Sequence, residues 1–488
     1  SERMRYEAQI KRLNRIMDTT INNLPAGIVV KEINNDFRYV YRNRESYNRD
    51  HFNDNPVGKN DYDFYPPIVA EKKRQEDIEV AATGKGLHWI AEGKDRNGNL
   101  IILDKRKIKV DGDELSSPII VSIEWDITEL EIQEVCEALR SGWITTGPRT
   151  KQLEKELAEY CHAAKLVCLN SATAAEEMNL RVLGIGEGDE VLVPAYTYTA
   201  TAAAAIHVGA TVKFIDSQKD SLEMDYDQME QAITEKTKAV IPVDLGGIPC
   251  DYDRIYQAVE GKKALFCPKG DVQEALGRVA VAADCAHGLG ASRNGVPTGA
   301  LADFTSFSFH AVKNFTTAEG GASAWRTLPG LDDEELYHRY QLLSLHGQSK
   351  DALAKTKLGA WEYDIVGPWY KCNMTDLMAA IGLKQLERYP GLLERRHQLI
   401  QRYDEALHPL GIRTLPHFTP DYTSSGHLYL TWTPGIGEKE RNEIILRMAE
   451  RGVACNVHYK PLPMMTAYKA MGFDIADYPN AYHHYENL

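Results

Sequence analysis

The pattern of apolar and polar positions changes character near residue 128. Before that point, short runs that alternate apolar and polar side chains predict half-buried strands of an antiparallel sheet. These runs span residues 27–33, 37–43, 86–93, 99–110 and 117–125. A charged amphipathic helix is expected over residues 1 to about 22, and another helix over 66–84, between the second and third strands. The first part of the chain is therefore predicted to be an α+β domain.

After residue 128 the pattern alternates helices with strands that are apolar almost throughout. Thr128 and Glu131 have the spacing of a capping box for a helix that ends near Gly142. The apolar runs lie at 165–169, 190–194, 211–216, 238–244, 278–284 and 304–310, and helical segments lie at 173–184, 200–209, 227–234 and 252–261. Strands of this kind are buried on both faces of a mostly parallel sheet. We predict an α/β domain that binds its ligand at the carboxyl ends of the strands.

Composition narrows the class of protein. A chain of 488 residues with 43% hydrophobic residues predicts two or three domains with substantial cores. The net charge of −14 argues against a nucleic-acid partner. The eight cysteines are scattered without a C-x-x-C pair, which predicts neither a disulfide framework nor a zinc site and suits a reducing cytosol. The amino-terminal segment is too polar for a signal peptide, and the longest apolar stretch, 199–210, is too short to cross a bilayer. A cytoplasmic protein without membrane contact is expected.

Polar residues with a shared chemistry follow three of the predicted strands. Asp284 ends one strand, and Lys313 follows the next. An amine and a carboxylate at one sheet edge suit pyridoxal phosphate, because the amine bonds to its aldehyde and the carboxylate keeps its pyridine nitrogen protonated. Ser171 and Thr173 open a helix, where hydroxyls and free backbone N–H groups form a phosphate cradle. Cradle, carboxylate and lysine are predicted to occupy successive positions along this edge.

Each of these residues also has a purely structural interpretation. Lys313 alone would be a solvated surface lysine, Asp284 a turn residue, and Ser171 and Thr173 plain helix caps. Only their joint placement favours a functional site.

Two rival sites use overlapping residues. Asp284, Cys285, His287 and His310 are a weak candidate set of metal ligands, because adjacent residues rarely reach one ion. Ser308, His310 and Asp284 imitate a hydrolase triad, but the chain has no G-x-S-x-G nucleophile turn. No metal site is therefore predicted.

The first quarter of the chain resembles a PAS sensory domain. The resemblance rests on the segments 24–43 and 57–67 and on the closing 123–129, in the predicted order of elements. It implies a ligand-binding or dimerisation unit over 1–127. His51 and His88 are formal candidates to hold haem, although packed or surface histidines are the commoner case.

The remainder resembles the sugar aminotransferases of the DegT/DnrJ/EryC1/StrS family, which have fold type I of the pyridoxal-phosphate enzymes. The matching segments are 139–161, 170–180, 188–204, 239–255, 281–291, 304–321, 361–386 and 456–463. The resemblance implies a large coenzyme-binding domain over 128–385 and a small α/β domain over 386–488. In the family the small domain continues further, so this one is expected to lack its last elements.

The resemblance also implies roles for residues around the coenzyme ring. Lys313 would be the lysine that bonds to the coenzyme and moves the proton. Asp284 would pair with the pyridine nitrogen, and His287 would lie near the phenolic oxygen. Tyr198 would stack on the ring face.

A second set would hold the phosphate. Ser171, Thr173 and Ser308 would bind it from the same subunit, and Asn373 would reach it from the neighbouring subunit. The resemblance therefore implies a homodimer with shared active sites.

The activity implied is transamination, because the family's lysine is retained at Lys313. Glutamate would be the amino donor, and the acceptor would be a nucleotide-linked keto sugar, in the closest resemblance a UDP-linked 4-keto-6-deoxy sugar destined for surface glycans. Two alternatives stay open: a ligand-sensing protein whose enzyme-like half is an impaired dimeric platform, and an enzyme acting on a cyclitol or aromatic ketone.

Overall fold

The computed structural model describes residues 26–43, 46, 56–94, 100–112, 117–126, 128–349, 362–433 and 435–487. The chain divides into two compact units, Ser1–Glu134 and Val135–Leu488. Helix α4 (Thr128–Ser141) crosses this division. The helix predicted near the amino terminus and the side chain of Thr128, predicted to cap α4, lie outside what is described. The division at 127/128 and the further one at 385/386 stay predictions.

The first unit is built on an antiparallel sheet. Within its described residues, five strands follow the order β2-β1-β5-β4-β3. They are β1 (Ala26–Glu32), β2 (Arg38–Arg42), β3 (Leu87–Lys94), β4 (Leu100–Val110) and β5 (Ile119–Asp126). Helix α3 (Pro67–Thr83) separates β2 from β3 in sequence and ends at Gly84, whose φ of 67° favours glycine. The predicted strands and helix are confirmed, whereas the PAS resemblance stays a prediction.

Charged side chains occupy much of the interior of this unit. Its apolar cluster is small, and its fully buried members are Phe37, Val80 and Ile120. Beside it Lys31 contacts Asp61 and lies 2.7 Å from a carboxylate oxygen of Asp77. Lys107 contacts the other oxygen of Asp77, also at 2.7 Å. Each buried ion thus has a counter-ion, which is the usual condition for burying charge.

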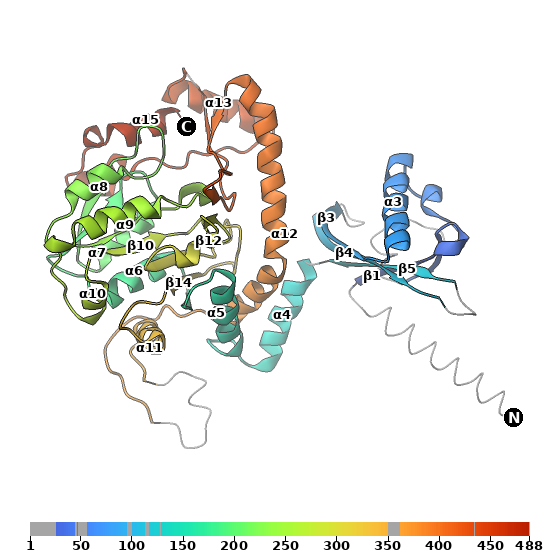
Figure 1. The fold of residues 1–488 in the computed structure, drawn as a ribbon, viewed down its shortest axis with the longest axis horizontal. Coiled ribbons are helices and arrows are strands. Elements are labelled where there is room, and N and C mark those ends of the chain that lie inside the picture. Colours follow the sequence, from blue (N-terminus) through green and yellow to red (C-terminus); the bar gives the residue numbers. More distant parts are fainter. Residues whose placement is uncertain are drawn as a thin grey trace. The chain divides into compact units, whose positions relative to one another are not determined.

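The second unit is built on a mixed sheet covered by helices (Figure 1). Within its described residues, the main sheet has seven strands in the order β6-β14-β13-β10-β9-β7-β8. They are β6 (Lys165–Leu169), β7 (Glu190–Pro194), β8 (Thr211–Ile215), β9 (Thr237–Val240), β10 (Ala280–Asp284), β13 (Phe304–Ser308) and β14 (Gly321–Trp325). The five strands from β13 to β8 are parallel, as predicted.

Strand β14 is the strand of the main sheet that the sequence pattern did not predict. It runs antiparallel to both of its neighbours, β13 and β6. It therefore separates the strand before the predicted cradle from the strand before Lys313. Along this edge the order is cradle, β14, lysine and carboxylate, whereas the sequence predicted cradle, carboxylate and lysine at successive positions.

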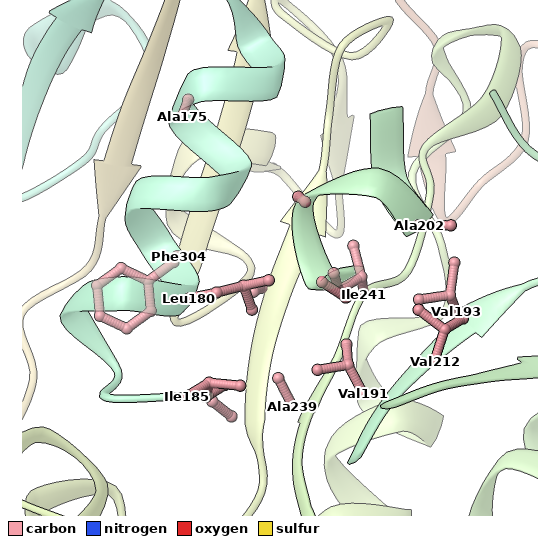
Figure 2. Packing of buried hydrophobic residues seen from close by; sticks show 14 of the residues in the cluster. Ala175, Leu180, Ile185, Val191, Val193, Ala202, Val212, Ala239, Ile241 and Phe304 are labelled. Carbon is pink, nitrogen blue, oxygen red and sulfur yellow. The ribbon is translucent and has the colours of Figure 1, made fainter. Parts of the chain in front are cut away.

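Helices pack on this sheet. The described helices of this unit after α4 are α5 (Pro148–Tyr160), α6 (Ala172–Val182), α7 (Thr199–His207), α8 (Tyr226–Ala232), α9 (Tyr252–Gly261), α10 (Asp271–Leu276), α11 (Asp333–Ser344), α12 (Asp376–Leu407), α13 (Glu438–Glu450), α14 (Thr466–Ala470) and α15 (Pro479–Asn487). Of these, α5, α6, α7, α9 and α11 pack directly on strands of the sheet. Figure 2 shows Leu180 of α6 beside Phe304 of β13, and Ala175 further along the same helix, within the largest apolar cluster. This packing holds α6 against the sheet.

The rest of the second unit consists of short strands around α12. They are β11 (Ser292–Arg293), β12 (Val296–Pro297), β15 (Arg413–Thr414), β16 (Tyr422–Thr423) and β17 (Thr431–Trp432). Helix α12 runs through residue 385 without a break and contains Pro390.

Among the described residues, none of the helices is both long enough and apolar enough to cross a membrane.

Candidate active site

The amino-terminal end of α6 carries the predicted phosphate cradle. Ser171 precedes the helix, and its Oγ accepts a hydrogen bond from the backbone N–H of Ala174 at 3.1 Å. The helix approaches the sheet closely because residue 321 is glycine: a Cβ there would lie 2.3 Å from the carbonyl carbon of Ser171. Other N–H groups of the first turn have no helical acceptor, and the positive end of the helix dipole favours an anion.

A cavity of about 380 Å³ gathers residues that follow the parallel strands. Seven of the eight residues predicted from the sequence line it. They are Ser171, Thr173, Tyr198, Asp284, His287, Ser308 and Lys313. Asn373 is not among the lining residues. Residues more than a hundred positions apart in sequence therefore share one enclosed space.

Asp284 is a buried carboxylate at the end of β10. One of its oxygens accepts a hydrogen bond from Oγ1 of Thr201 at 2.7 Å, and the other accepts from the backbone N–H of Ala286 at 3.1 Å. Burial raises the pKa of Asp284, whereas these two hydrogen bonds and the nearby charge of Lys313 oppose the rise. The carboxylate is thus held in place by two neutral donors and has no ion pair with any described residue, which suits the binding of a protonated pyridine nitrogen.

Lys313 lies in the loop after β13 and is half-buried. Burial lowers the pKa of its amine, and the carboxylate of Asp284 opposes this shift. Its Nζ has no hydrogen bond or ion pair with any described residue. A lowered pKa increases the neutral fraction of the amine, which is the form that attacks an aldehyde or accepts a proton.

His287 is buried as a neutral imidazole. Its pKa lies well below the ordinary value because of burial and because of the nearby His427 and Lys313. Nδ1 accepts a hydrogen bond from the backbone N–H of Gly246 at 3.2 Å, so the ring proton is on Nε2. Nε2 lies 3.2 Å from the hydroxyl of Tyr459. His287 therefore presents a hydrogen-bond donor to the cavity.

Tyr198 occupies the rim of the cavity at the residue preceding α7. Its side chain is 59% exposed, and its ring centroid lies 5.9 Å from that of Tyr459. An exposed aromatic face at the edge of a cavity can cover a planar ligand.

Asn373 lies outside this cavity. Its side-chain amide donates to Oγ1 of Thr146 and, at 3.4 Å, to the backbone oxygen of Met374. The predicted role of Asn373 across a subunit boundary stays a prediction.

The cavity also contains residues that the sequence analysis did not single out. They include Glu176, Thr197, Asp244, Glu319, His458 and Tyr459. Tyr459 and His458 lie in a segment that was recognised as matching the family, but no local pattern assigned them a role. Glu176 lies inside a predicted helix, where helical spacing alone does not distinguish a buried acid from an exposed one.

The geometry does not support the rival sites. The ring Nδ1 of His310 faces the N–H of Val312 at 3.4 Å, and its Nε2 lies 3.5 Å from Glu319, so it does not bridge Ser308 and Asp284. In the part of the chain that the structure describes, no three histidine, cysteine or acidic side chains are arranged to hold a metal ion. Of the two haem candidates, His88 is exposed on β3, and His51 lies outside the described residues.

The groups that line the cavity match the parts of pyridoxal phosphate one by one. Hydroxyls and helix N–H groups suit its phosphate, an amine with a lowered pKa suits its aldehyde, and a buried carboxylate suits its pyridine nitrogen. A neutral imidazole donor suits its phenolic oxygen.

Comparison with known proteins identifies a family for residues 125–488. This segment matches the model of the DegT/DnrJ/EryC1/StrS aminotransferase family. The spore coat polysaccharide biosynthesis protein SpsC of Bacillus subtilis is 38% identical over 363 residues, which are 73% of this chain and 87% of SpsC. The UDP-4-amino-4-deoxy-L-arabinose–oxoglutarate aminotransferase of Shewanella sediminis is 36% identical over 338 residues, 68% of this chain and 81% of that enzyme.

Solved structures show the same similarity. Spr1654 of Streptococcus pneumoniae, assigned as a sugar aminotransferase, has been solved in its PMP form. It is 58% identical, has a TM-score of 0.72, and the alignment covers 74% of this chain and 91% of that one. Its PLP form is 57% identical with the same TM-score, and the alignment covers 74% of this chain and 90% of that one.

Proposed function

The chain belongs to the DegT/DnrJ/EryC1/StrS aminotransferase family and is a pyridoxal-phosphate-dependent aminotransferase, and from this premise we propose that it transfers an amino group from glutamate to a nucleotide-linked keto sugar. The observation that carries the proposal is that Lys313 and Asp284 line one cavity, with the pKa of the amine lowered and that of the carboxyl raised.

Each residue has a defined task in this proposal. Bound pyridoxal phosphate supplies an electron sink for the carbanion formed at the amino donor. Asp284 holds the proton on the pyridine nitrogen, and Thr201 fixes the orientation of its carboxylate. The Nζ of Lys313 takes the proton from the donor's Cα and returns it at the other carbon. His287 donates from Nε2 to the phenolic oxygen, and Tyr198 covers one ring face.

The phosphate is held by the cradle at α6. Ser171 and Thr173 bind it together with the free N–H groups of the first turn, and Ser308 binds it from the end of β13. We propose that Asn373 of a second subunit completes this site in a homodimer.

The names of the relatives support the choice of substrates. One curated relative is named for a UDP-linked amino sugar and oxoglutarate, and another for polysaccharide biosynthesis. The proposed acceptor is therefore a UDP-linked 4-keto sugar, with surface glycans as the destination of the product.

For the first unit we propose a sensory or dimerisation role of the PAS type. The order β2-β1-β5-β4-β3 with a helical insertion after β2 supports this proposal. It is tested in the full chain by measuring mass by light scattering for wild type and Lys31→Met. A dimerisation role predicts a weaker dimer in the variant, and an unchanged dimer contradicts it.

A half-reaction tests the enzymatic proposal most directly. The protein loaded with pyridoxal phosphate is mixed with glutamate, and release of 2-oxoglutarate is measured without any sugar. We expect one equivalent per active site with glutamate and none with Lys313→Ala. A panel of UDP-linked keto sugars then completes the cycle. Absence of 2-oxoglutarate from a coloured, folded protein would rule out glutamate as donor.

A further inference from the structure

A buried acid lines the same cavity as the phosphate cradle and Asp284. Glu176 is on α6, three residues after Thr173, and only 3% of its surface is exposed. It lines the same cavity as Thr173 and Asp284. Nothing in the mechanism above uses it.

The carboxyl group of Glu176 has no protein partner. Neither of its oxygens forms a hydrogen bond with any described residue. The next residue behaves differently: Glu177 contacts Arg181 at 2.7 Å and His207 at 3.2 Å. A buried and unsatisfied polar group is unfavourable, so its presence beside a binding cavity points to a ligand that satisfies it.

Two features favour the neutral form of Glu176. Burial raises the pKa of its carboxyl well above the ordinary value, and the negative charge of Asp284 raises it further. A neutral carboxylic acid carries one O–H donor, and this donor has no acceptor among the described protein groups.

The geometry of a helix directs this donor toward the cradle. Side chains of an α-helix lean toward its amino terminus, and residues three apart lie on the same face. From this general geometry we expect the carboxyl of Glu176 over the turn that contains Thr173, and both residues line the cavity.

We propose that Glu176 is a further phosphate-binding residue of the coenzyme site, a neutral carboxylic acid whose O–H donates a hydrogen bond to a phosphate oxygen. The inference rests on the coenzyme site proposed above. An O–H donor to an anionic oxygen forms a short and strong hydrogen bond. The same residue as a carboxylate would repel the phosphate, so its buried surroundings are what make it suitable.

Inorganic phosphate tests this without the reaction. Its affinity for the coenzyme-free full chain is measured by calorimetry for wild type, Glu176→Leu, Glu176→Gln and the neighbouring control Glu177→Gln. We expect Glu176→Leu to weaken phosphate binding about tenfold, the loss of one hydrogen bond to a charged group. Glu176→Gln keeps an N–H donor and should stay within about threefold of wild type, since its donor replaces the lost one. Glu177→Gln should match wild type.

A second measurement reports on the coenzyme itself. The phosphorus NMR shift of bound pyridoxal phosphate should change in Glu176→Leu and remain near the wild-type value in Glu177→Gln. A residue that only packs the helix would leave this signal unchanged.

Three results would overturn the proposal. They are phosphate affinity in Glu176→Leu that equals or exceeds wild type, an equal loss in Glu176→Gln, and an unchanged phosphorus signal. Lys313→Ala separates this test from that of the enzymatic proposal, because it should abolish transamination and retain both phosphate affinity and its dependence on Glu176.

Discussion

The two units bury charged side chains in opposite ways. In the first unit Lys31, Lys107 and Asp77 meet at 2.7 Å contacts, with Asp61 beside them. Burial raises the pKa of Asp61, but the attraction of Lys31 outweighs it, so the net shift is downward. The lowered pKa favours the ionised form of Asp61, and the ion pairs of Lys31 and Lys107 hold strands β1 and β4 to helix α3.

In the cavity of the second unit, buried charges have no such partners. Burial moves the pKa values of Lys313, Asp284 and Glu176 toward their neutral forms. The same unit pairs its ions elsewhere: Asp303 contacts Arg278 and Arg326, each at 2.7 Å. The difference therefore belongs to the cavity and not to the unit as a whole. The paired buried ions contribute to the stability of the fold, whereas the unpaired groups in the cavity mark a candidate binding site.

The largest effect is expected where an unpaired group performs the chemistry. Lys313→Ala should lower kcat by about 10⁴-fold, because the base that moves the proton is lost. The visible absorption band of bound coenzyme should disappear, while the unfolding transition of the second unit remains. Activity within tenfold of wild type would contradict the role of Lys313.

A large effect on stability, and not on chemistry, is expected from breaking the paired network. Lys31→Met leaves Asp61 and part of Asp77 without a counter-ion and should destabilise the first unit by about 3–5 kcal/mol. Hydrogen exchange of peptides from β1, β4 and α3 measures this in the full chain. The half-reaction at the second unit should keep its wild-type rate, and an equal loss at both units would contradict the comparison.

In the coenzyme-free protein, the unpaired Glu176 should make the free energy of unfolding depend on pH. Its folded-state pKa is raised, so its favourable contribution is fully present below its ordinary value of 4.5 and is lost as the pH rises through the folded-state pKa. Glu176→Gln lacks this titration and should gain stability over wild type as the pH rises, by about 1–3 kcal/mol at most.

Denaturant unfolding of both proteins from pH 4.5 to 8 measures this difference. Other titratable groups line the same cavity: Asp244, Asp284, His287, His310, Lys313, Glu319 and His458. The contributions of groups that do not interact with Glu176 are common to both proteins and cancel, whereas that of Asp284 remains, because its charge acts directly on Glu176. A difference that is constant with pH would show that Glu176 does not titrate as inferred.

The smallest effect should follow from altering a hydrogen bond to an unpaired group. Thr201→Val removes the 2.7 Å hydrogen bond to Asp284 and should raise the pKa of that carboxyl further. A carboxyl with a higher pKa competes more strongly for the shared proton and would leave the pyridine nitrogen less protonated, so kcat should fall about tenfold, or about 1.4 kcal/mol. Thr197→Val, which changes a neighbouring threonine bonded to Thr201 but not to Asp284, is the matched control.

The sequence predicted the elements that its periodicity marks. Runs such as 165–169 and 190–194 are apolar throughout, and they form β6 and β7 at those positions. Strand β14 was missed because its residues, Gly-Ala-Ser-Ala-Trp, are mostly small and lack the branched side chains typical of strands. It is held in the sheet by its neighbours on both sides, and such long-range pairing is invisible in a local pattern.

The site was predictable in part for the same reason. Lys313, Asp284 and Ser171 follow elements with clear patterns, and the cavity brings them together. Tyr459 reaches His287 from 172 positions away, and the unpartnered Glu176 differs from the ion-paired Glu177 only by its direction on the helix. Neither the Tyr459–His287 contact nor the burial of Glu176 can be recognised from the local sequence pattern.

Strand β14 also sets the distance between the ends of β6 and β13. Adjacent strands lie about 4.8 Å apart, so one interposed strand sets the ends of β6 and β13 roughly 10 Å from each other. That width would accommodate a six-membered ring with its phosphate arm, with α6 at one end and Lys313 at the other, as the proposed function requires. A chain that omitted β14 would bring the two anchors to half that spacing and leave no room for the coenzyme between them.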